Sequence, residues 1–424
     1  MERYKEYRET AIPWLAMLPS HWKEKRAKYI YEKQNRVPEE TDEVITCFRD
    51  GEVTLRKNRR TTGFTESFKE IGYQGIKKGD LVIHQMDAFA GSTGVSDSDG
   101  KGTPVYSVCT PIDGQSLTLY HAKVIRLMGL NGFIQSLYRG IRERSSDFRF
   151  ETFARQVLPL PPLSEQEQIV RYLEDKTSKI DAYVSEKEKE ILLLQELKQK
   201  TIADAVTKGL NPDVKMKDSG ISWIGDIPEH WETKRVASFF TGKVETNLDF
   251  FYKHAFKFYY GTLVPKNEVG DEDEYRETYV KYSVIHKDDI LINGLNLNYD
   301  FVSQRVAIAP SDGIITSAYI VVRPRNGTNA LYYNYLFKAM DSMKLFHGMG
   351  TGIRLTLSYD ELKKQVIVVP PADEQRSIVS YIEEKCQKID SLTTELQSEI
   401  DYLKEYKQRL IADCVTGQVN VQNH

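Results

Sequence analysis

The sequence predicts an α+β fold with an internal pseudo-two-fold repeat, in which two mixed α/β domains are joined by two long helices packed as an antiparallel coiled coil. Three observations lead to this prediction. Short motifs recur at a constant distance along the chain, and apolar residues recur every seven positions in two long segments. In the segments between them, short strand-like and helix-like runs alternate.

Two motifs occur twice, and both pairs are separated by 209 residues. The first contains Pro-x-His-Trp; it spans residues 12–26 and 221–235 and includes all four tryptophans of the chain. The second begins with Pro-Pro-x-x-Glu-Gln at Pro161 and Pro370 and continues to Thr207 and Thr416. The segments between the motifs, 27–160 and 236–369, share their length but little local pattern. Preserved ends with diverged middles indicate one scaffold that carries two different recognition surfaces.

After each Pro-Pro pair the sequence predicts a helix of about 40 residues, roughly 60 Å long at ~1.5 Å per residue. Ser164 and Asp373 are the predicted N-caps, and Gly209 and Gly417 are predicted to end the helices. Apolar residues at seven-residue spacing predict that the two helices pack on each other, although two amphipathic helices on separate cores are the alternative. The seams are Leu173, Ile180, Val184, Ile191 and Leu194 in the first helix, and Ile382, Ile389, Leu396, Leu403 and Leu410 in the second.

The net charge of −3 conceals two kinds of region. The predicted helices, 165–207 and 373–416, together carry 20 acidic and 13 basic residues. Segment 23–160 carries 22 basic and 18 acidic residues, and segment 232–369 carries 17 and 16. The globular segments are therefore mildly basic, which permits DNA binding without requiring it.

Nothing in the sequence indicates a membrane or an oxidising compartment. No run approaches the ~18 consecutive apolar residues of a membrane span, and the charged first residues do not resemble a signal peptide. The four cysteines (Cys47, Cys109, Cys386 and Cys414) have neither paired nor metal-binding spacing, so we interpret them as reduced thiols. We expect a cytoplasmic protein without membrane contacts.

Both variable segments are predicted to mix strands and helices in a similar order. Strands are expected at 80–83, 104–108, 122–125, 289–292, 305–308 and 318–322, and helices near 131–142 and 330–346. The strands at 80–83 and 289–292 lead into polar loops at 85–94 and 293–299. Asn and Gln can pair with adenine edges, and small residues let the backbone approach, although a solvated loop is the alternative.

Basic residues cluster at 56–60 and 139–149, and the counterpart of the latter in the second segment is 350–354. Such clusters are typical of phosphate contacts, with a solvated surface as the alternative. The candidate DNA contacts are Arg56, Lys57, Arg59, Arg60, Gln85, Ser92, Thr93, Arg142, Arg144, Arg149, Asn293, Asn296, Asn298, Tyr299, Arg305, Thr351 and Arg354.

The motifs of common enzyme sites are missing. The sequence contains no G-x-x-x-x-G-K-[ST], no H-E-x-x-H and no Asn-Pro-Pro-Tyr-like methyltransferase signature. Glu-x-Lys triplets of the kind found in nucleases occur, but 28% charged residues make such triplets common by chance. We expect no catalytic residue, no metal and no cofactor, with a fused nuclease or methyltransferase as the alternative.

The paired tryptophan motifs, the paired Pro-Pro-x-x-Glu-Gln helix starts and the 209-residue repeat resemble the specificity (S) subunit of type I restriction-modification systems. This resemblance covers essentially the whole chain. It implies two target recognition domains, each for one half of a bipartite asymmetric DNA sequence, and two spacer helices that set the spacing and dock two modification (methyltransferase) subunits. Restriction subunits with motor and nuclease activity would join them, and S-adenosylmethionine, ATP and magnesium would belong to these partners.

The division that follows is 1–160 and 211–369 for the target recognition domains, and 161–210 and 370–424 for the spacer helices with the C-terminal tail. A coiled-coil adaptor with two heads that bind no DNA is the alternative function. Binding at graded salt separates the two, because DNA contacts weaken steeply as salt rises. The candidate spacer and partner-binding residues are Glu165, Gln166, Ile180, Ile191, Glu374, Gln375, Ile389, Leu396 and Leu403.

Overall fold

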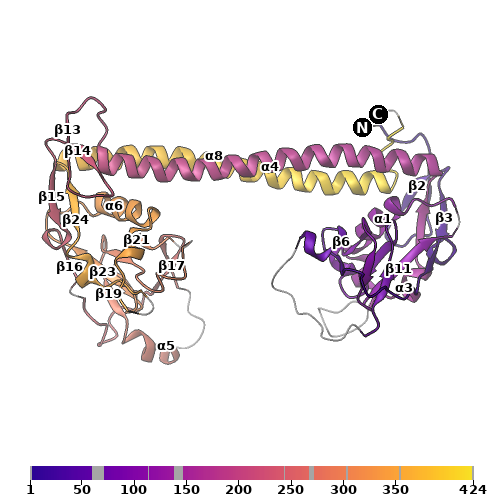
Figure 1. Ribbon diagram of the computed structural model, residues 1–424, viewed down its shortest axis with the longest axis horizontal. Helices are drawn as coiled ribbons and strands as arrows, with labels where there is room; N and C mark the ends of the chain where they lie inside the picture. Colours follow the sequence, from indigo (N-terminus) through magenta and orange to yellow (C-terminus); the bar gives the residue numbers. More distant parts are fainter. Residues whose placement is uncertain are drawn as a thin grey trace. The chain divides into compact units, whose positions relative to one another are not determined.

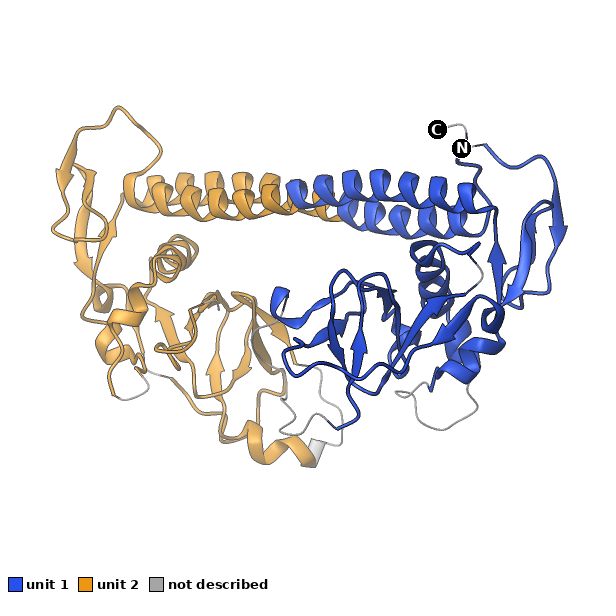
Figure 2. Ribbon diagram, turned by 45° about the vertical axis from the view of Figure 1, so that its right-hand side comes forward, with its two compact units in different colours: residues 1–187, 398–424 blue, residues 188–397 orange. Residues whose placement is uncertain are grey.

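The computed structural model describes residues 2–59, 71–112, 114–137, 147–242, 244–266, 272–301, 304–352 and 355–422. The chain forms two compact units, coloured separately in Figure 2. Unit 1 contains residues 1–187 and 398–424, and unit 2 contains residues 188–397. The two long helices, α4 (Leu163–Lys208) and α8 (Ala372–Val415), each begin in one unit and end in the other. Each unit therefore has a globular part and a segment of both helices.

Unit 1 is organised around a four-stranded antiparallel sheet of order β4-β11-β8-β9. Smaller antiparallel pairs are β1 with β2, β3 with β12, β5 with β6, and β7 with β10. The strands are β1 (Tyr7–Glu9), β2 (Met17–Pro19), β3 (Lys23–Arg26), β4 (Tyr31–Lys33), β5 (Ile45–Cys47), β6 (Val53–Leu55), β7 (Gln74–Ile76), β8 (Leu81–His84), β9 (Thr93–Val95), β10 (Gly100–Gly102), β11 (Tyr106–Pro111) and β12 (Val157–Leu160). The helices are α1 (Thr118–Leu130), α2 (Phe133–Ser136) and α3 (Phe150–Arg155), with short 3-10 turns η1 (Ala27–Tyr29), η2 (Arg56–Asn58) and η3 (Ala88–Ala90).

Unit 2 repeats this plan with a four-stranded antiparallel sheet of order β16-β23-β20-β21. Its smaller pairs are β13 with β14, β15 with β24, β17 with β18, and β19 with β22. The strands are β13 (Met216–Asp218), β14 (Asp226–Pro228), β15 (Glu232–Arg235), β16 (Phe240–Thr241), β17 (Phe256–Tyr259), β18 (Thr262–Pro265), β19 (Ser283–Ile285), β20 (Ile290–Ile292), β21 (Val306–Ile308), β22 (Gly313–Ile315), β23 (Ile320–Pro324) and β24 (Val366–Val369). The helices are α5 (Glu272–Tyr279), α6 (Ala330–Ser342) and α7 (Tyr359–Leu362), with 3-10 turns η4 (Val236–Ser238) and η5 (Leu345–Gly348).

One inner strand of each four-stranded sheet, β8 in unit 1 and β20 in unit 2, has both faces buried. Side chains alternate along a strand, so Leu81 and Ile83 of β8 face the core that contains α1, whereas Val82 faces the core formed by β5 and β6. In unit 2, Ile290 of β20 faces the core that contains α6, and Leu291 faces the core that contains β17 and β18. The same layering in both units confirms that one scaffold underlies the two diverged segments.

Within each unit a segment of α4 lies beside a segment of α8 (Figure 1). In unit 1 the ammonium of Lys407 is 2.6 Å from the carboxylate of Asp181, and in unit 2 that of Lys198 is 2.6 Å from that of Asp390. Both pairs join one position late in one helix to one position early in the other, so the helices run antiparallel. The two ion pairs join equivalent positions, because Asp390 and Lys407 lie 209 residues after Asp181 and Lys198. The register of the helices therefore follows the predicted pseudo-two-fold repeat.

The predicted seams face inward along both helices. Leu173 and Val184 of α4 and Ile382, Leu396 and Leu410 of α8 are buried. The remaining seam residues, Ile180, Ile191, Leu194, Ile389 and Leu403, are half-buried. Gly209 (φ +75°) and Gly417 (φ +70°) adopt the left-handed conformation after the helices, as predicted. A seven-residue apolar repeat was therefore sufficient to identify the packed face.

Three local predictions were wrong. Residues 122–125 belong to helix α1 rather than to a strand, because Val124 and Ile125 are buried on the helix face that also carries Met128. The helix expected near 131–142 is represented by α2 alone, and residues 138–142 lie outside the described ranges. Ser164 and Asp373 are not N-caps, since α4 begins at Leu163 and α8 at Ala372. Pro162 precedes the first residue of α4, and its carbonyl accepts hydrogen bonds from the amides of Glu165 and Gln166.

Candidate functional site

A buried tryptophan motif fastens the globular part of unit 1 to the first turn of α4. The indole of Trp22 donates to Oε1 of Glu165 at 3.1 Å, and Nε2 of His21 is 2.9 Å from Oε2 of the same carboxylate. The Tyr4 hydroxyl also donates to Oε1, and burial, followed by this hydrogen bond, raises the pKa of Tyr4. Three donors therefore converge on one carboxylate that is only 2% exposed.

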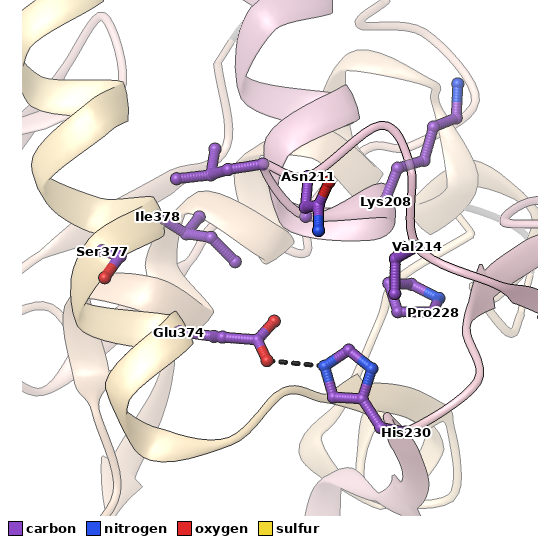
Figure 3. A pocket seen from close by; sticks show the side chains of 10 residues that line it. Lys208, Asn211, Val214, Pro228, His230, Glu374, Ser377 and Ile378 are labelled. Carbon is purple, nitrogen blue, oxygen red and sulfur yellow. Dashed lines mark hydrogen bonds and ion pairs between the residues drawn. The ribbon is translucent and has the colours of Figure 1, made fainter.

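Unit 2 contains the same arrangement at the first turn of α8. The indole of Trp231 donates to Oε2 of Glu374 at 2.9 Å, and Nε2 of His230 is 2.5 Å from Oε1 (Figure 3). This pair borders a hollow whose other walls come from Lys208, Asn211, Pro228 and neighbouring residues. Glu374 is 41% exposed, and the described contacts include no third donor corresponding to Tyr4.

A tyrosine and the tryptophan of each globular part also lie against the end of the other long helix. In unit 1 the Tyr120 hydroxyl donates to the carbonyl of Val415 at 2.8 Å, and in unit 2 that of Tyr332 donates to the carbonyl of Val206 at 2.8 Å. A Cβ built on Gly417 would lie 3.1 Å from the Trp22 ring, and one built on Gly209 would lie 3.1 Å from the Trp231 ring. Each globular part is thus fixed to the start of one helix and the end of the other.

Four candidate partner-binding residues at the helix starts take part in this fastening, and three of them, Glu165, Gln166 and Gln375, are buried. Glu165 and Glu374 accept from the tryptophan motifs, as described above. Gln166 donates to the carbonyls of Gln115 and Pro161 at 2.9 Å, and Gln375 donates to that of Pro370 at 2.9 Å. Because Glu165, Gln166 and Gln375 are buried and hydrogen-bonded inside the chain, we do not retain these three in a partner surface, whereas Glu374 is 41% exposed and stays a candidate. The other five candidates form the helix seam: Ile180, Ile191, Ile389, Leu396 and Leu403.

The first basic cluster lies at the surface and is already paired with acids. Lys57 is 2.5 Å from Glu43, and Arg59 is 2.6 Å from Asp50. Arg56 is half-buried, with its Nε donating to Thr46 at 3.3 Å. Arg149 is exposed and lies 2.6 Å from Asp147. Three further candidates of this unit lie outside the described residues: Arg60, Arg142 and Arg144.

The polar loop of unit 1 is held in shape by an arginine of α1. Nη1 of Arg126 donates to the carbonyls of Arg49 at 2.5 Å and Gly91 at 2.7 Å. Gln85, at the start of the loop, is half-buried and near Ser107. Ser92 and Thr93 are buried, so neither side chain can reach a base without rearrangement, and we do not retain them as DNA contacts.

The polar loop of unit 2 is held by Arg305. Its guanidinium donates to the carbonyls of Asn293 at 3.0 Å, Leu295 at 2.8 Å and Asp300 at 2.7 Å. Because Arg305 is completely buried, it supports the loop and is withdrawn as a DNA contact. Asn296 and Tyr299 project outward from the same loop.

The remaining candidates of unit 2 are mixed. Asn293 and Asn298 are half-buried, and the Oδ1 atom of Asn293 accepts from the amide of Leu295 at 3.1 Å. Thr351 is exposed beside a bridge to Thr356, whereas Arg354 lies outside the described residues. The outward-facing candidates of this unit are therefore Asn296, Tyr299 and Thr351.

Sequence comparison agrees with this architecture. The family model of the type I restriction modification DNA specificity domain matches residues 228–402. Residues 228–402 therefore match the DNA specificity domain of type I restriction-modification systems, and the chain is similar to specificity subunits of those systems. Type I restriction enzyme EcoBI specificity subunit of Escherichia coli is 23% identical over 333 residues, which cover 72% of this chain and 65% of the relative. The MjaVIII specificity subunit of Methanocaldococcus jannaschii is 24% identical over 290 residues, or 63% of each chain. The chain thus spans 60–65% of the length of the curated specificity subunits that it matches.

Solved structures share the fold of this chain. One, described under "Structural basis underlying complex assembly and conformational transition of the type I R-M system", has a TM-score of 0.65 at 16% identity and covers 95% of this chain and 99% of its own. The HsdS subunit from Thermoanaerobacter tengcongensis has a TM-score of 0.52 at 15% identity, with 95% and 98% coverage. At these identities the likeness establishes the fold, including the two domains and the packed long helices.

The described part of the chain contains no group of three or more His, Cys, Asp or Glu side chains able to hold a metal ion. No helix among the described residues is long and apolar enough to cross a membrane. All four cysteines are free and buried, and burial raises the pKa of the Cys47 and Cys414 thiols to about 12. These thiols therefore stay protonated and unreactive at neutral pH.

Proposed function

We propose that this chain is the DNA sequence-recognition subunit of a type I restriction-modification complex. Its two target recognition domains, 1–160 and 211–369, each read one half of a bipartite asymmetric DNA target. The spacer segments, 161–210 and 370–424, set the distance between the half-sites and dock two modification subunits. The chain itself is non-catalytic, and the chemistry belongs to those subunits and to the restriction subunits that join them.

One observation carries this proposal: two equivalent scaffolds present different polar loops. Loops 85–94 and 293–299 follow equivalent strands, β8 and β20, and each is held by an arginine that binds its backbone carbonyls. The loops nevertheless differ in length and in side chains. A repeated scaffold with unlike reading surfaces is suited to two unlike half-sites joined by a spacer of fixed length.

The outward-facing polar and basic groups give each domain the means to contact DNA. Lys57, Arg59 and Arg149 of unit 1 would contact phosphates, since their acidic partners are exposed and can exchange with a phosphate oxygen. Gln85 in unit 1 and Asn296 in unit 2 are amides able to pair with base edges, and Tyr299 adds an exposed aromatic ring. Phosphate contacts would supply affinity and the loops would supply sequence preference.

Methylome sequencing of a host that expresses the intact system tests the proposal. The expected result is one methylated motif with two different half-sites separated by a fixed run of unspecified bases. The single variants Gln85→Ala and Tyr299→Ala should each relax one half-site and leave the other unchanged. A continuous motif would refute the reading of two half-sites. No methylated motif, together with no salt-dependent DNA binding, would instead favour an adaptor that binds no DNA.

A further inference from the structure

The two tryptophan motifs differ in the group that covers their glutamate. In unit 1 the ring centre of Tyr4 lies 5.4 Å from that of His21 and 6.0 Å from that of Trp22. The Tyr4 hydroxyl donates to Glu165, and the residue is only 9% exposed. Tyr4 also belongs to the same hydrophobic core as Val419, which follows the end of α8. A phenol ring therefore closes the motif of unit 1.

Unit 2 has an acid at the position equivalent to Tyr4. Strands β13 and β14 pair in the same register as β1 and β2, which makes Asp213 the equivalent residue, and it is exposed. Leu210 is 42% exposed, whereas its equivalent Val419 is 8% exposed. The glutamate side chain differs in the same direction, with 41% exposed in unit 2 against 2% in unit 1. The surface that Tyr4 covers in unit 1 is thus open in unit 2.

A hollow of about 240 Å³ lies at this place in unit 2 (Figure 3). Its apolar walls come from Leu210, Val214, Pro228 and Ile378. The hydrogen-bonded pair of Glu374 and His230 forms one edge. An apolar cavity of ~150 Å³ holds one benzene ring, and sites for drug-sized ligands begin at ~300 Å³. The hollow therefore has room for one aromatic ring with a polar substituent.

The carboxylate at this edge can accept a further hydrogen bond. An ionised carboxylate has about four lone-pair sites, and Glu374 uses them for Trp231 and His230 among the described contacts. Glu165 accepts from three donors in the same motif, so the geometry admits a third. Lys208 also lines the hollow and would repel an ammonium group, whereas an anion would be repelled by Glu374. The matching ligand is a neutral ring with one hydroxyl donor.

We propose that this hollow is a binding site for a phenol group, whose hydroxyl donates to Glu374 while the ring covers Leu210 and Pro228. A free phenolic compound and a tyrosine of a bound polypeptide present the same ring and donor. When bound, the phenol joins the start of α8 to strand β14 and to the chain that follows α4, as Tyr4 joins the equivalent parts of unit 1. Its binding therefore stabilises unit 2 by mass action.

Titration of the full chain with p-cresol, followed by ligand-observed NMR, measures this binding. We expect a Kd of about 1 mM, the range of a weakly bound single-ring ligand. Toluene lacks the hydroxyl and n-butylamine carries an ammonium instead, so both should bind about tenfold more weakly or not at all. Hydrogen exchange with saturating p-cresol should show added protection at 208–214 and 372–378, with residues 2–7 unchanged.

The peptide acetyl-glycyl-tyrosyl-glycinamide separates the two sources of the phenol. If it binds as tightly as p-cresol, the hollow admits a tyrosine with its main chain. If p-cresol binds and the peptide does not, the ligand is a free phenolic compound. Both results support a phenol site, whereas a chain that binds neither probe has no such site.

Matched variants locate the binding. Glu374→Ala should abolish it, whereas Glu229→Ala should leave the Kd unchanged, because this exposed carboxylate is 2.7 Å from Lys215 and does not line the hollow. Tyr4→Ala should open the equivalent place in unit 1 and add a second p-cresol site. Melting curves verify folding, and the comparison of p-cresol with toluene on the unaltered chain needs no variant. Toluene binding as tightly as p-cresol, n-butylamine binding more tightly, or unchanged binding in Glu374→Ala would each overturn the proposal.

Discussion

Replacing Glu165 by alanine should destabilise unit 1 far more than the equivalent change at Glu374 destabilises unit 2. Glu165 is buried and accepts from Trp22, His21 and Tyr4, and two of these donors are themselves buried. Its loss leaves the Trp22 and Tyr4 donors unpaired in the interior, which costs about 3–5 kcal/mol. Glu374 is 41% exposed, so water can replace it and the cost falls to about 1 kcal/mol.

Urea unfolding monitored by hydrogen exchange of peptides 12–26 and 221–235 measures the stability of each unit separately. Glu165→Ala should lower the protection of the first peptide, and Glu374→Ala should lower that of the second by a smaller amount. The control is Glu167→Ala, since this carboxylate is exposed in the same turn of α4 and should change the free energy of unfolding by less than about 0.5 kcal/mol. Equal losses for the two alanine variants would refute the assignment of Glu165 as the more deeply integrated acceptor.

Three further predictions follow from helix length, burial and backbone conformation. Inserting seven residues after Glu190 and after Glu399 adds ~10 Å to each helix at ~1.5 Å per residue. The DNA spacer should therefore lengthen by about three base pairs, with both half-sites unchanged. Altered half-sites in methylome sequencing would contradict this. Burial raises the pKa of Asp341 above its ordinary value, so the stability that it contributes is present below about pH 4 and is lost as pH rises through the folded-state pKa. The gain in free energy of unfolding from Asp341→Asn should therefore grow from pH 4 to 7 in urea titrations. A gain that does not depend on pH would show that the buried carboxylate is not its source. Gly417→Ala should lower the melting temperature more than Gly209→Ala, because a Cβ at Gly417 would lie 2.6 Å from the Pro19 ring, whereas the nearest atom to a Cβ at Gly209 is in Trp231 at 3.1 Å. Equal shifts would show that the left-handed φ alone matters.

Periodic features could be predicted from the sequence, and long-range contacts could not. Apolar residues every seven positions identified the seam because burial on a helix is a local property of spacing. The role of Glu165 was interpreted incorrectly, since nothing local distinguishes a carboxylate that binds a partner from one that accepts from Trp22, 143 residues earlier. Its recurrence with Trp231 and Glu374 at the same separation was the available signal.

The burial of individual polar residues could not be predicted from the sequence either. An arginine beside an amide-rich loop fits phosphate binding, yet Arg305 lies inside the domain and donates to three carbonyls. The strand expected at 122–125 failed for a similar reason, because Val124 and Ile125 favour strands locally but are buried on a helix. Tertiary context outweighed local preference in both cases.

The discontinuity of unit 1 has a consequence for biosynthesis. Its core includes Leu410, Cys414 and Val419, and the amide of Asn420 donates to the carbonyl of Glu2 at 2.9 Å. Unit 2 is one uninterrupted stretch, 188–397, whereas unit 1 also needs residues 398–422. A ribosome moving from N- to C-terminus therefore releases everything that unit 2 requires before unit 1 can close. Unit 1 begins to be synthesised first but cannot complete its core until the last residues are made, whereas unit 2 can fold before then.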